Sequence, residues 1–404
     1  MKYIIPLCLT LILIFFISSS NNTSVNCSVA LSKKNASNFI WANQPHKANT
    51  ATTGLNYSQS IPIKKNIYKS SNFLSGTFIQ PDCILKWNYK DYDSHFKEYK
   101  ALGFDHIVLQ WAEYYDPSNK TLYTYYPSKL SKRKLKKDLL TPLLKYGQKY
   151  NIEVYIGLNM NEQWWDTISK SPDQFELWWK KEALQSITLT NDIWDKYKRF
   201  ALSDNFSSFG GWYIPFEIDN LAFYSVEKQN VLSKHLSLIT NHIKQTSDLP
   251  ILLAPFFYRS TEILAGIQHW EKMWVNILSK TDIDIITLQD GIGCKRDSWL
   301  YNNSNNSKSI DSIGKWFNAT KEAIKKSSKK VELWADLETF TEDNNNRFSS
   351  APLDRIIRQL NAESPHVTKF TSFSFQAYQD FDKDKRAFER YKEYVNKIRN
   401  NIFY

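Results

Sequence analysis

The chain has 404 residues, of which 42% are hydrophobic and 15% aromatic, which suits one large folded domain better than several small ones. The formal net charge of +11 is carried partly by basic runs such as residues 129–138 and 321–330, which are typical of solvated helix faces. No zinc-finger spacing, RNA-binding motif or basic heptad accompanies these runs, so we expect no nucleic-acid partner. An acidic polymer or an anionic cell surface stays open as a partner.

The N-terminus has the pattern of a targeting segment. In residues 1–20, MKYIIPLCLTLILIFFISSS, one Lys precedes an apolar run and small residues follow it, as in a secretory signal peptide. The run is short for a membrane span, which needs ~20 apolar residues, so an uncleaved signal anchor is the alternative. Residues 21–72, rich in Ser, Asn and Thr, are predicted to form a flexible linker or stalk. We therefore expect a secreted, periplasmic or cell-surface protein, which meets a membrane only through such an anchor.

Residues 73–404 alternate between short apolar runs and helical stretches. The eight runs that we predict as strands are 74–80, 106–111, 153–159, 212–218, 250–256, 284–290, 331–338 and 368–378. The helices predicted between and after them include 92–102, 137–150, 172–185, 191–202 and 388–398. This order predicts an α/β protein with a single (β/α)8 TIM barrel. An open doubly wound sheet is disfavoured, because no glycine-rich phosphate loop follows the first strand.

Two features lie outside this regular alternation. The Tyr-rich segment 113–127 is too long for a plain loop between a strand and a helix. Cys83 and Cys294 both fall in loops predicted at the carboxyl end of the barrel, so a disulfide between them is conceivable. Unpaired thiols are an equal alternative.

Two strand ends carry the residues with the clearest chemical meaning. Glu217 ends the fourth predicted strand and Glu338 ends the seventh. A (β/α)8 barrel builds its active site at the carboxyl ends of its strands, and two carboxylates at one site are the minimum equipment for glycoside hydrolysis. The predicted catalytic pair is therefore Glu217 and Glu338. A Glu at a strand end can instead cap a helix or pair with a basic side chain.

Other polar and aromatic residues fall at the same predicted face. Supporting or alternative carboxylates are Asp290, Asp336 and Glu113. Candidate substrate-binding residues are Gln110, Trp111, Asn159, Trp164, Tyr258, Trp299, Gln376 and Tyr378. There is no GxSxG motif, and the histidines avoid the predicted carboxyl ends of the strands. We therefore expect neither a serine hydrolase, nor a metal site, nor a cofactor.

Several of these strand ends together resemble a known family. The matching stretches are SGTFIQPD, LGFDHIVLQWAEY, GWYIPFEIDN, DIITLQDGIG, VELWADLETF and FTSFSFQAY, which cover the predicted barrel but not the linker. They resemble the domain-of-unknown-function 4434 family of secreted, glycoside-hydrolase-like TIM barrels. The resemblance implies an acid/base at strand four and a nucleophile at strand seven, which map to Glu217 and Glu338. One departure is Phe216, where the related retaining hydrolases usually have an Asn that binds the sugar 2-hydroxyl.

The main hypothesis is a secreted glycoside hydrolase that acts on a glycan or polysaccharide by a two-carboxylate, retaining mechanism. The alternative is a catalytically silent barrel that binds a glycan or a cell-envelope polymer. A barrel enzyme of another class, such as a lyase or transglycosidase, is the third hypothesis. All three expect a carbohydrate ligand and leave the sugar and its linkage open.

Overall fold

The computed structural model describes residues 72–259, 265–294, 306–343, 345 and 347–400. The predicted signal peptide and all but the last residue of the predicted linker lie outside these ranges. Within them, no helix is both long enough and apolar enough to cross a membrane.

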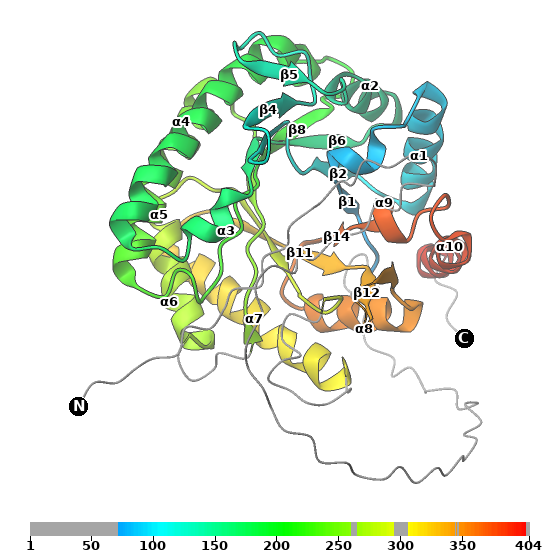
Figure 1. The fold of residues 1–404 in the computed structure, drawn as a ribbon. Helices are drawn as coiled ribbons and strands as arrows, with labels where there is room; N and C mark the ends of the chain where they lie inside the picture. Colours follow the sequence, from blue (N-terminus) through cyan, green and yellow to red (C-terminus); the bar gives the residue numbers. More distant parts are fainter. Residues whose placement is uncertain (1–71, 260–264, 295–305, 344, 346, 401–404) are drawn as a thin grey trace, which may run out of the picture.

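Eight parallel strands close into a barrel, which confirms the predicted fold (Figure 1). Their order around the barrel is β1-β14-β11-β10-β9-β8-β6-β2. The strands are β1 (Gly76–Ile79), β2 (His106–Leu109), β6 (Glu153–Gly157), β8 (Phe209–Ile214), β9 (Ile251–Leu253), β10 (Ile285–Gln289), β11 (Glu332–Glu338) and β14 (Lys369–Phe373). β8 and β11, which carry the two candidate carboxylates, are separated by β9 and β10, so their ends lie on different sides of the barrel mouth.

Helices surround the barrel. They are α1 (Tyr89–Leu102), α2 (Leu140–Tyr150), α3 (Gln163–Thr167), α4 (Pro172–Tyr197), α5 (Val226–Thr246), α6 (Ile267–Leu278), α7 (Asn306–Ser327), α8 (Leu353–Glu363), α9 (Phe375–Tyr378) and α10 (Lys385–Arg399), with short 3-10 helices η1 (Pro81–Ile84) and η2 (Lys198–Phe200). α1 shows why these segments begin and end where they do: Asn88 and Asp91 form a capping box, and Gly103 ends the helix at φ 90°.

The structure corrects the prediction of two helices over 172–185 and 191–202, since α4 runs through both as one helix. The stretch between them contains Ser186, Thr188 and Thr190, which have low helix propensity. There the Thr188 and Thr190 hydroxyls bond back to the carbonyls of Leu184 and Ser186, and Leu189 and Ile193 are buried. Packing against the barrel therefore outweighs the low helix propensity of this stretch.

Two of the predicted strands end four or more residues earlier than expected. β8 stops at Ile214, because Pro215 has no N–H to donate to a neighbouring strand. β14 stops at Phe373, and the predicted strand 368–378 continues as α9 instead. The Thr77 hydroxyl, which accepts a hydrogen bond from Phe375 N (3.0 Å), helps to hold this turn against β1.

The barrel interior is filled by side chains rather than open. Its core cluster contains Phe78, Val108, Tyr155, Tyr213, Leu252, Ala254, Ile285 and Trp334. His106 also lies inside, where its Nε2 lies 2.6 Å from the Thr371 hydroxyl and its ring faces Gly76. A Cβ at Gly76 would lie 2.3 Å from that nitrogen, so only glycine fits there. The filled interior leaves the carboxyl end of the barrel as the place for a site.

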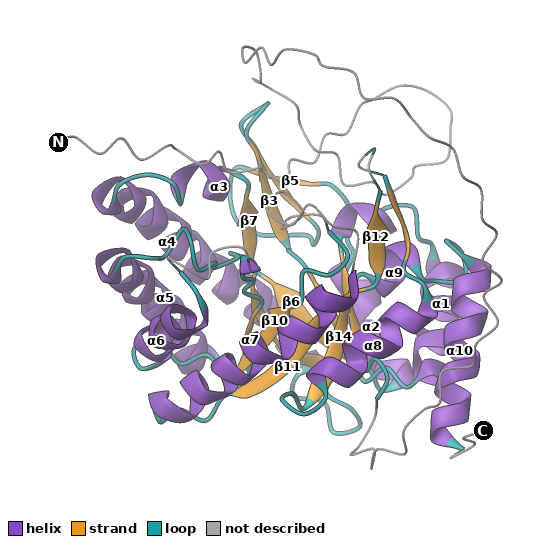
Figure 2. Ribbon diagram, turned by 90° about the horizontal axis from the view of Figure 1, so that it is seen from below, coloured by secondary structure: helices purple, strands orange, loops and turns teal. Residues whose placement is uncertain are grey.

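The excursion after β2 forms a small sheet at that end. Strands β3 (Glu113–Asp116), β4 (Thr121–Thr124), β5 (Arg133–Leu135) and β7 (Asn159–Asn161) pair in the order β5-β4-β3-β7. β12 (Phe340–Glu342) and β13 (Phe348–Ser350) form a second small sheet, a hairpin that follows β11. Figure 2 shows β3, β5, β7 and β12 standing together beyond one end of the barrel.

Candidate active site

The alternation of side chains along β11 directs its acidic residues into the barrel mouth. Trp334 belongs to the interior cluster, so Asp336 and Glu338, two and four residues later, point to the same side. Leu333, Ala335 and Leu337 pack in the outer core. Both carboxylates are 2% exposed. The sequence argument that these two residues share one face therefore agrees with the packing.

The Glu338 carboxylate is held by the backbone of the loop after β10. Its Oε2 accepts hydrogen bonds from Gly293 N (2.6 Å) and Cys294 N (2.9 Å). A Cβ on Gly293 would come within 2.4 Å of the Phe340 carbonyl oxygen and 3.0 Å of the Glu338 Cβ. Glycine is thus required for this loop to approach Glu338 so closely.

Glu217 lies beyond the end of β8 and is only partly buried. Tyr213 faces the interior, whereas Ile214, Phe216 and Ile218 pack in the outer core, so alternation places Glu217 on the mouth side. In agreement, the charge of Glu217 contributes to the raised pKa of Tyr213, after burial as the larger cause. The Glu217 carbonyl oxygen accepts a hydrogen bond from Trp164 Nε1 (2.9 Å).

Trp164 itself is fully buried in an aromatic cluster. Its ring centroid lies 5.1 Å from that of Phe216 and 5.5 Å from that of Trp179. The ring predicted to bind substrate therefore packs against protein and supports the backbone of Glu217. Phe216, at the position where the resemblance led us to look for an Asn, packs in the same cluster.

Asp336 links the two candidate catalytic residues electrostatically. Its pKa is raised well above the usual range, first by burial and then by the charges of Asp290, Glu338 and Glu217. Its Oδ1 is buried and has no hydrogen-bond partner among the described residues. A neutral, protonated Asp336 between the two glutamates fits this environment.

Asp290 faces outward, away from the mouth, and bonds to α8. A polar stripe of three buried residues, Arg355, Gln359 and Glu363, runs along that helix. Gln359 Nε2 donates to Asp290 Oδ2, while Asp290 Oδ1 accepts from Glu338 N (3.3 Å). Burial, followed by the Glu338 charge, raises the pKa of Asp290 to about 6. Burial, followed by the Asp290 charge, raises the pKa of Glu363 well above its usual value.

The polar stripe also holds the backbone on both sides of the candidate nucleophile. Arg355 is 3% exposed and donates to the carbonyl oxygens of Glu338 (3.0 Å), Phe340 and Ile292 (3.4 Å). Glu338 and the loop that carries its N–H donors are therefore fixed to one helix. Sequence reasoning missed this support, although the i, i+4, i+8 spacing of the stripe on an amphipathic helix was visible.

Glu113 and Asn159 contact α4 rather than the other carboxylates. Glu113 is fully buried and accepts from Arg133 Nε (2.9 Å) and from Gln185 Nε2 (2.5 Å). Asn159 Nδ2 donates to Glu182 (2.9 Å), whose pKa burial raises to about 7. Glu182 is a second functional candidate that sequence reasoning missed, because it lies in the middle of a long helix.

The remaining predicted residues differ in their surroundings. Gln110 Oε1 and both amide atoms of Gln376 are buried and without a hydrogen-bond partner in the described part of the chain. Buried polar atoms rarely lack a hydrogen-bond partner, so at a barrel mouth these atoms are candidates for binding a ligand. Trp111 contacts Tyr114, and Tyr378 packs on Phe340. Tyr258 is partly exposed after β9, and Trp299 lies outside the described residues.

Cys83 is disulfide-bonded and Cys294 is in no disulfide, so the conceivable pairing of the two is wrong. Cys294 serves the site through its backbone N–H instead. The loop after β10 is thus held by Glu338 and Arg355 rather than by a covalent link to Cys83.

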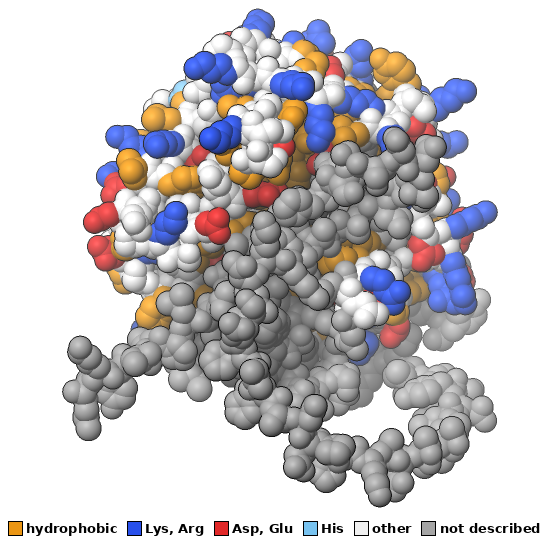
Figure 3. All heavy atoms as spheres, in the orientation of Figure 1, with side chains coloured by type: hydrophobic (Ala, Val, Ile, Leu, Met, Phe, Trp, Pro, Cys, Tyr) orange, Lys and Arg blue, Asp and Glu red, His pale blue; other side chains and the backbone are white. Residues whose placement is uncertain are grey.

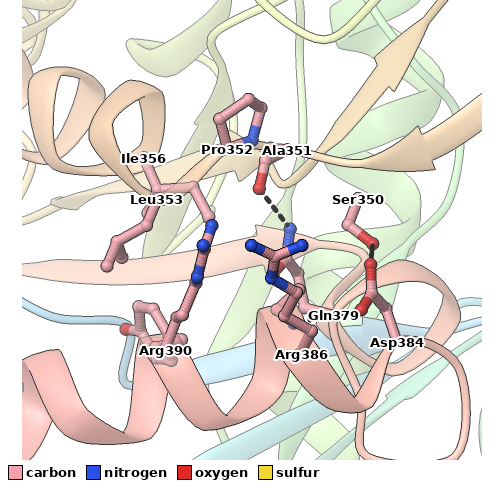
Figure 4. Close-up of a pocket in the computed structure, with 11 residues that line it drawn as sticks. Ser350, Ala351, Pro352, Leu353, Ile356, Gln379, Asp384, Arg386 and Arg390 are labelled. Carbon is pink, nitrogen blue, oxygen red and sulfur yellow. Dashed lines mark hydrogen bonds between the residues drawn. The ribbon is translucent and has the colours of Figure 1, made fainter. Parts of the chain in front are cut away.

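A pocket lies beside the β12–β13 hairpin and does not include the carboxylates at the strand ends (Figure 4). Its lining includes Ser350, Gln379, Asp384, Arg386 and Arg390, the last two from α10. Gln379 Nε2 donates to Ala351 O (3.0 Å), and Asp384 Oδ2 accepts from Ser350 Oγ (2.6 Å), so both side chains already have partners.

One group of side chains has the composition of a metal site. His95, Asp380 and Asp382 place ligand atoms within 4.8 Å of one another. The His95 Nδ1 lies 3.0 Å from Asp380 and its Nε2 lies 3.8 Å from Asp382, while the ring stacks on Trp87 (4.0 Å). Each ring nitrogen therefore faces its own carboxylate, one buried on Asp380 and one exposed on Asp382.

Comparison with solved structures found several similar chains. A protein from Bacteroides thetaiotaomicron VPI-5482, assigned provisionally as an alpha-L-fucosidase, matches with a TM-score of 0.61 at 21% identity, over 83% of this chain and 99% of that chain. An endo-1,4-beta-mannanase from Rhizomucor miehei matches with a TM-score of 0.42 at 11% identity, over 75% and 86% of the two chains. The glycoside hydrolase domain of PgaB (BpsB) from Bordetella bronchiseptica gives a TM-score of 0.44 at 10% identity, over 79% and 98%.

A search of curated proteins found no match. The family model described as "Domain of unknown function (DUF4434)" matches residues 74–385, which is most of the chain and contains every strand of the barrel. The chain therefore belongs to the DUF4434 family.

Proposed function

We propose that the protein is a secreted glycoside hydrolase that cleaves a glycan or polysaccharide by a retaining, two-carboxylate mechanism. The observation that carries this proposal is the group of acidic side chains at the carboxyl end of the barrel, where the charges of Glu217, Glu338 and Asp290 all act on the buried Asp336. Carboxylates from strands on different sides of the mouth are what acid and nucleophile require on either side of a glycosidic bond.

In this mechanism Glu338 is the nucleophile. Its carboxylate is oriented by two backbone N–H groups at one oxygen, and a fixed orientation is what attack on an anomeric carbon requires. Glu217 is the acid/base: it protonates the leaving oxygen in the first step and removes a proton from water in the second. Its partial exposure suits a group that must exchange protons with solvent.

Asp336 has a positioning role in this scheme. Burial and the neighbouring carboxylates raise its pKa well above the usual range, which favours the neutral acid beside the two glutamates. A neutral carboxylic acid can donate a hydrogen bond to one of them.

A catalytically silent glycan-binding barrel is the second candidate. The observation that favours it is Phe216, which packs against Trp164 and Trp179 and so offers no amide to a sugar hydroxyl. Under this alternative the buried, unpartnered atoms of Gln110 and Gln376 would bind glycan without turnover.

The test is a screen of polysaccharides and aryl glycosides with wild type, Glu217→Gln and Glu338→Gln. Glu389→Gln, an exposed change of the same type on α10, is the control. We expect turnover by wild type and the control and none by Glu338→Gln. Glycan binding without turnover in every variant would support the silent barrel instead, and wild-type rates in both site variants would remove the proposed pair.

A further inference from the structure

The small sheet at the barrel mouth carries a row of aromatic and basic side chains on one face. Register places Tyr114 of β3 opposite Tyr123 of β4, and Tyr123 opposite Lys134 of β5. Residues paired in this way point to the same side of a sheet. The Lys134 Nζ lies 5.8 Å from the Tyr123 ring centroid, which confirms that the two side chains share this face. We call Tyr114, Tyr123 and Lys134 the aromatic–basic row.

The row leads to the mouth of the barrel. The ring of Trp111, which follows the end of β2, lies 6.0 Å from that of Tyr114. Next to Trp111 in the chain, Gln110 has its buried, unpartnered Oε1. The aromatic–basic row, Trp111 and Gln110 thus form a path from the outer edge of the small sheet to the end of a barrel strand.

The other face of the small sheet is covered. Glu113 and Asn159 lie opposite each other on β3 and β7 and bond to Gln185 and Glu182 of α4. Among the described residues the aromatic–basic row is less covered: Tyr114 and Tyr123 are partly exposed and Lys134 is exposed, while Tyr114 bonds to Glu162 at the N-cap of α3. This face is therefore the one on which a ligand can lie.

Positive charge dominates this edge of the molecule. Lys129, Lys132, Lys134 and Lys136 are all exposed, and Figure 3 shows Lys and Arg side chains gathered in the region where Figure 1 places β4 and β5. Asp82 pairs with Lys136 (2.9 Å). In the described part of the chain, Lys132 and Lys134 form no ion pair.

We propose that the aromatic–basic row is a binding subsite for an acidic oligosaccharide, whose chain it leads into the barrel mouth. Tyr rings offer flat apolar surfaces for the C–H faces of sugar rings, and the adjacent ammonium groups attract the carboxylate or sulfate groups of the sugar. A neutral glycan would use only the rings. The inference rests on the proposed glycoside hydrolase function, because it names the class of substrate for that site.

The experiment measures binding to oligomers of galacturonic acid, with xylan oligomers of the same length as the neutral probe. All proteins carry Glu217→Gln and Glu338→Gln, so binding is read without turnover. The test variants are Lys132→Gln with Lys134→Gln, and Tyr123→Ala. The matched control is Lys325→Gln with Lys330→Gln, two exposed lysines at the other end of the barrel, in the last turn of α7 and in the loop that follows it.

We expect the acidic oligomer to bind more tightly than xylan and to weaken as salt is raised from about 0.05 to 0.5 M. Removing the two lysines should weaken binding of the acidic oligomer about five- to tenfold. It should also make that binding less sensitive to salt. Tyr123→Ala should weaken both probes roughly tenfold, and the control should stay within about twofold of its parent.

Three results would overturn the inference: equal affinity for both oligomers, an equal loss in the control pair, or stronger binding to phosphatidylglycerol vesicles than to the acidic oligomer. The last would make this face a membrane contact. Hydrolysis is scored separately, in proteins with Glu217 and Glu338 restored. Turnover of neutral glycans alone would leave the proposed function standing and remove this inference. If the acidic oligomer binds in a lysine-dependent way but no glycan is turned over, the subsite stands and the proposed hydrolase function is removed.

Discussion

The ends of β8 and β11 carry the two candidate catalytic residues, but they hold them in different ways. Glu338 is the last residue of β11, is 2% exposed, and is tied to two backbone N–H groups and, through its main chain, to α8. Glu217 lies three positions after the end of β8, is partly exposed, and accepts a hydrogen bond at its carbonyl from the indole nitrogen of Trp164.

This difference matches the two tasks of a retaining mechanism. A nucleophile must meet one carbon atom in one geometry, so it gains from a rigid support. An acid/base must serve a leaving oxygen and then a water molecule, so access to solvent is useful to it. The comparison predicts that changes at the β11 end will impair activity on every substrate, whereas changes at the β8 end will have effects that depend on the substrate.

The largest effect is expected from Glu338→Gln. The variant cannot form the covalent intermediate, so turnover of all substrates should fall on the order of 10⁴-fold. Initial rates on the best substrate measure this, with circular dichroism to confirm the fold. A residual rate above about a tenth of wild type would remove Glu338 as the nucleophile.

Glu217→Gln should impair substrates unequally. Glycosides with poor leaving groups need protonation and should lose roughly 10²–10³-fold, whereas the first step on dinitrophenyl glycosides should be nearly unchanged. Pre-steady-state bursts of dinitrophenolate would show that the intermediate then accumulates. If the loss is the same for all leaving groups, Glu217 is not the acid.

Gly293→Ala tests the support of Glu338 without changing a carboxylate. Its Cβ would meet the Phe340 carbonyl at 2.4 Å, so the loop must shift away from Glu338. We expect kcat to fall about 10- to 100-fold and stability to fall by about 1–3 kcal/mol. Gly314→Ala is the control, because its Cβ would meet its nearest neighbour only at 3.3 Å. An unchanged kcat in Gly293→Ala would show that the two N–H donors are dispensable.

The buried Asp290, which accepts a hydrogen bond from the Glu338 backbone N–H, predicts that stability depends on pH. The pKa of Asp290 rises from 3.8 to about 6 on folding, so the native state binds more protons than the unfolded state between these values. The contribution of Asp290 to stability is therefore fully present below about pH 4, and it is lost as the pH rises through 6. Asp290→Asn should flatten the decrease in Tm over this range by a few degrees. An unchanged slope would show that Asp290 is already ionised.

The smallest effect is expected from Trp164→Phe. The change removes the hydrogen bond to the Glu217 carbonyl but keeps most of the aromatic packing, and should cost about 1 kcal/mol of stability. Activity should fall only a few-fold, with the larger loss on poor leaving groups. A uniform loss as large as that of Gly293→Ala would contradict the comparison between the two strand ends.

The sequence was sufficient for the barrel because each parallel strand is a buried apolar run between helical patterns, and all eight strands lie within the predicted runs or, for β8, overlap one. It could not show the small sheet, because β7 pairs with β3 across about 45 residues and no local pattern encodes that pairing.

At the strand ends, the acidic residues could be named from position alone, but not their directions. Asp290 turns outward to α8, where Arg355, Gln359 and Glu363 are buried; burial is rare for charged residues, so residue type alone could not predict it. Glu182 escaped notice for the same reason.

The way the small sheet is joined to the barrel has a consequence for the rate of ligand capture. β7 follows β6 with only Leu158 between them, and β3 follows β2 after residues 110–112, so two barrel strands run on almost directly into the wall beside the mouth. Such a wall has little room for a hinge. A ligand that lands on it need not wait for a loop to close, and association there should be governed by diffusion and charge rather than by a slow conformational step.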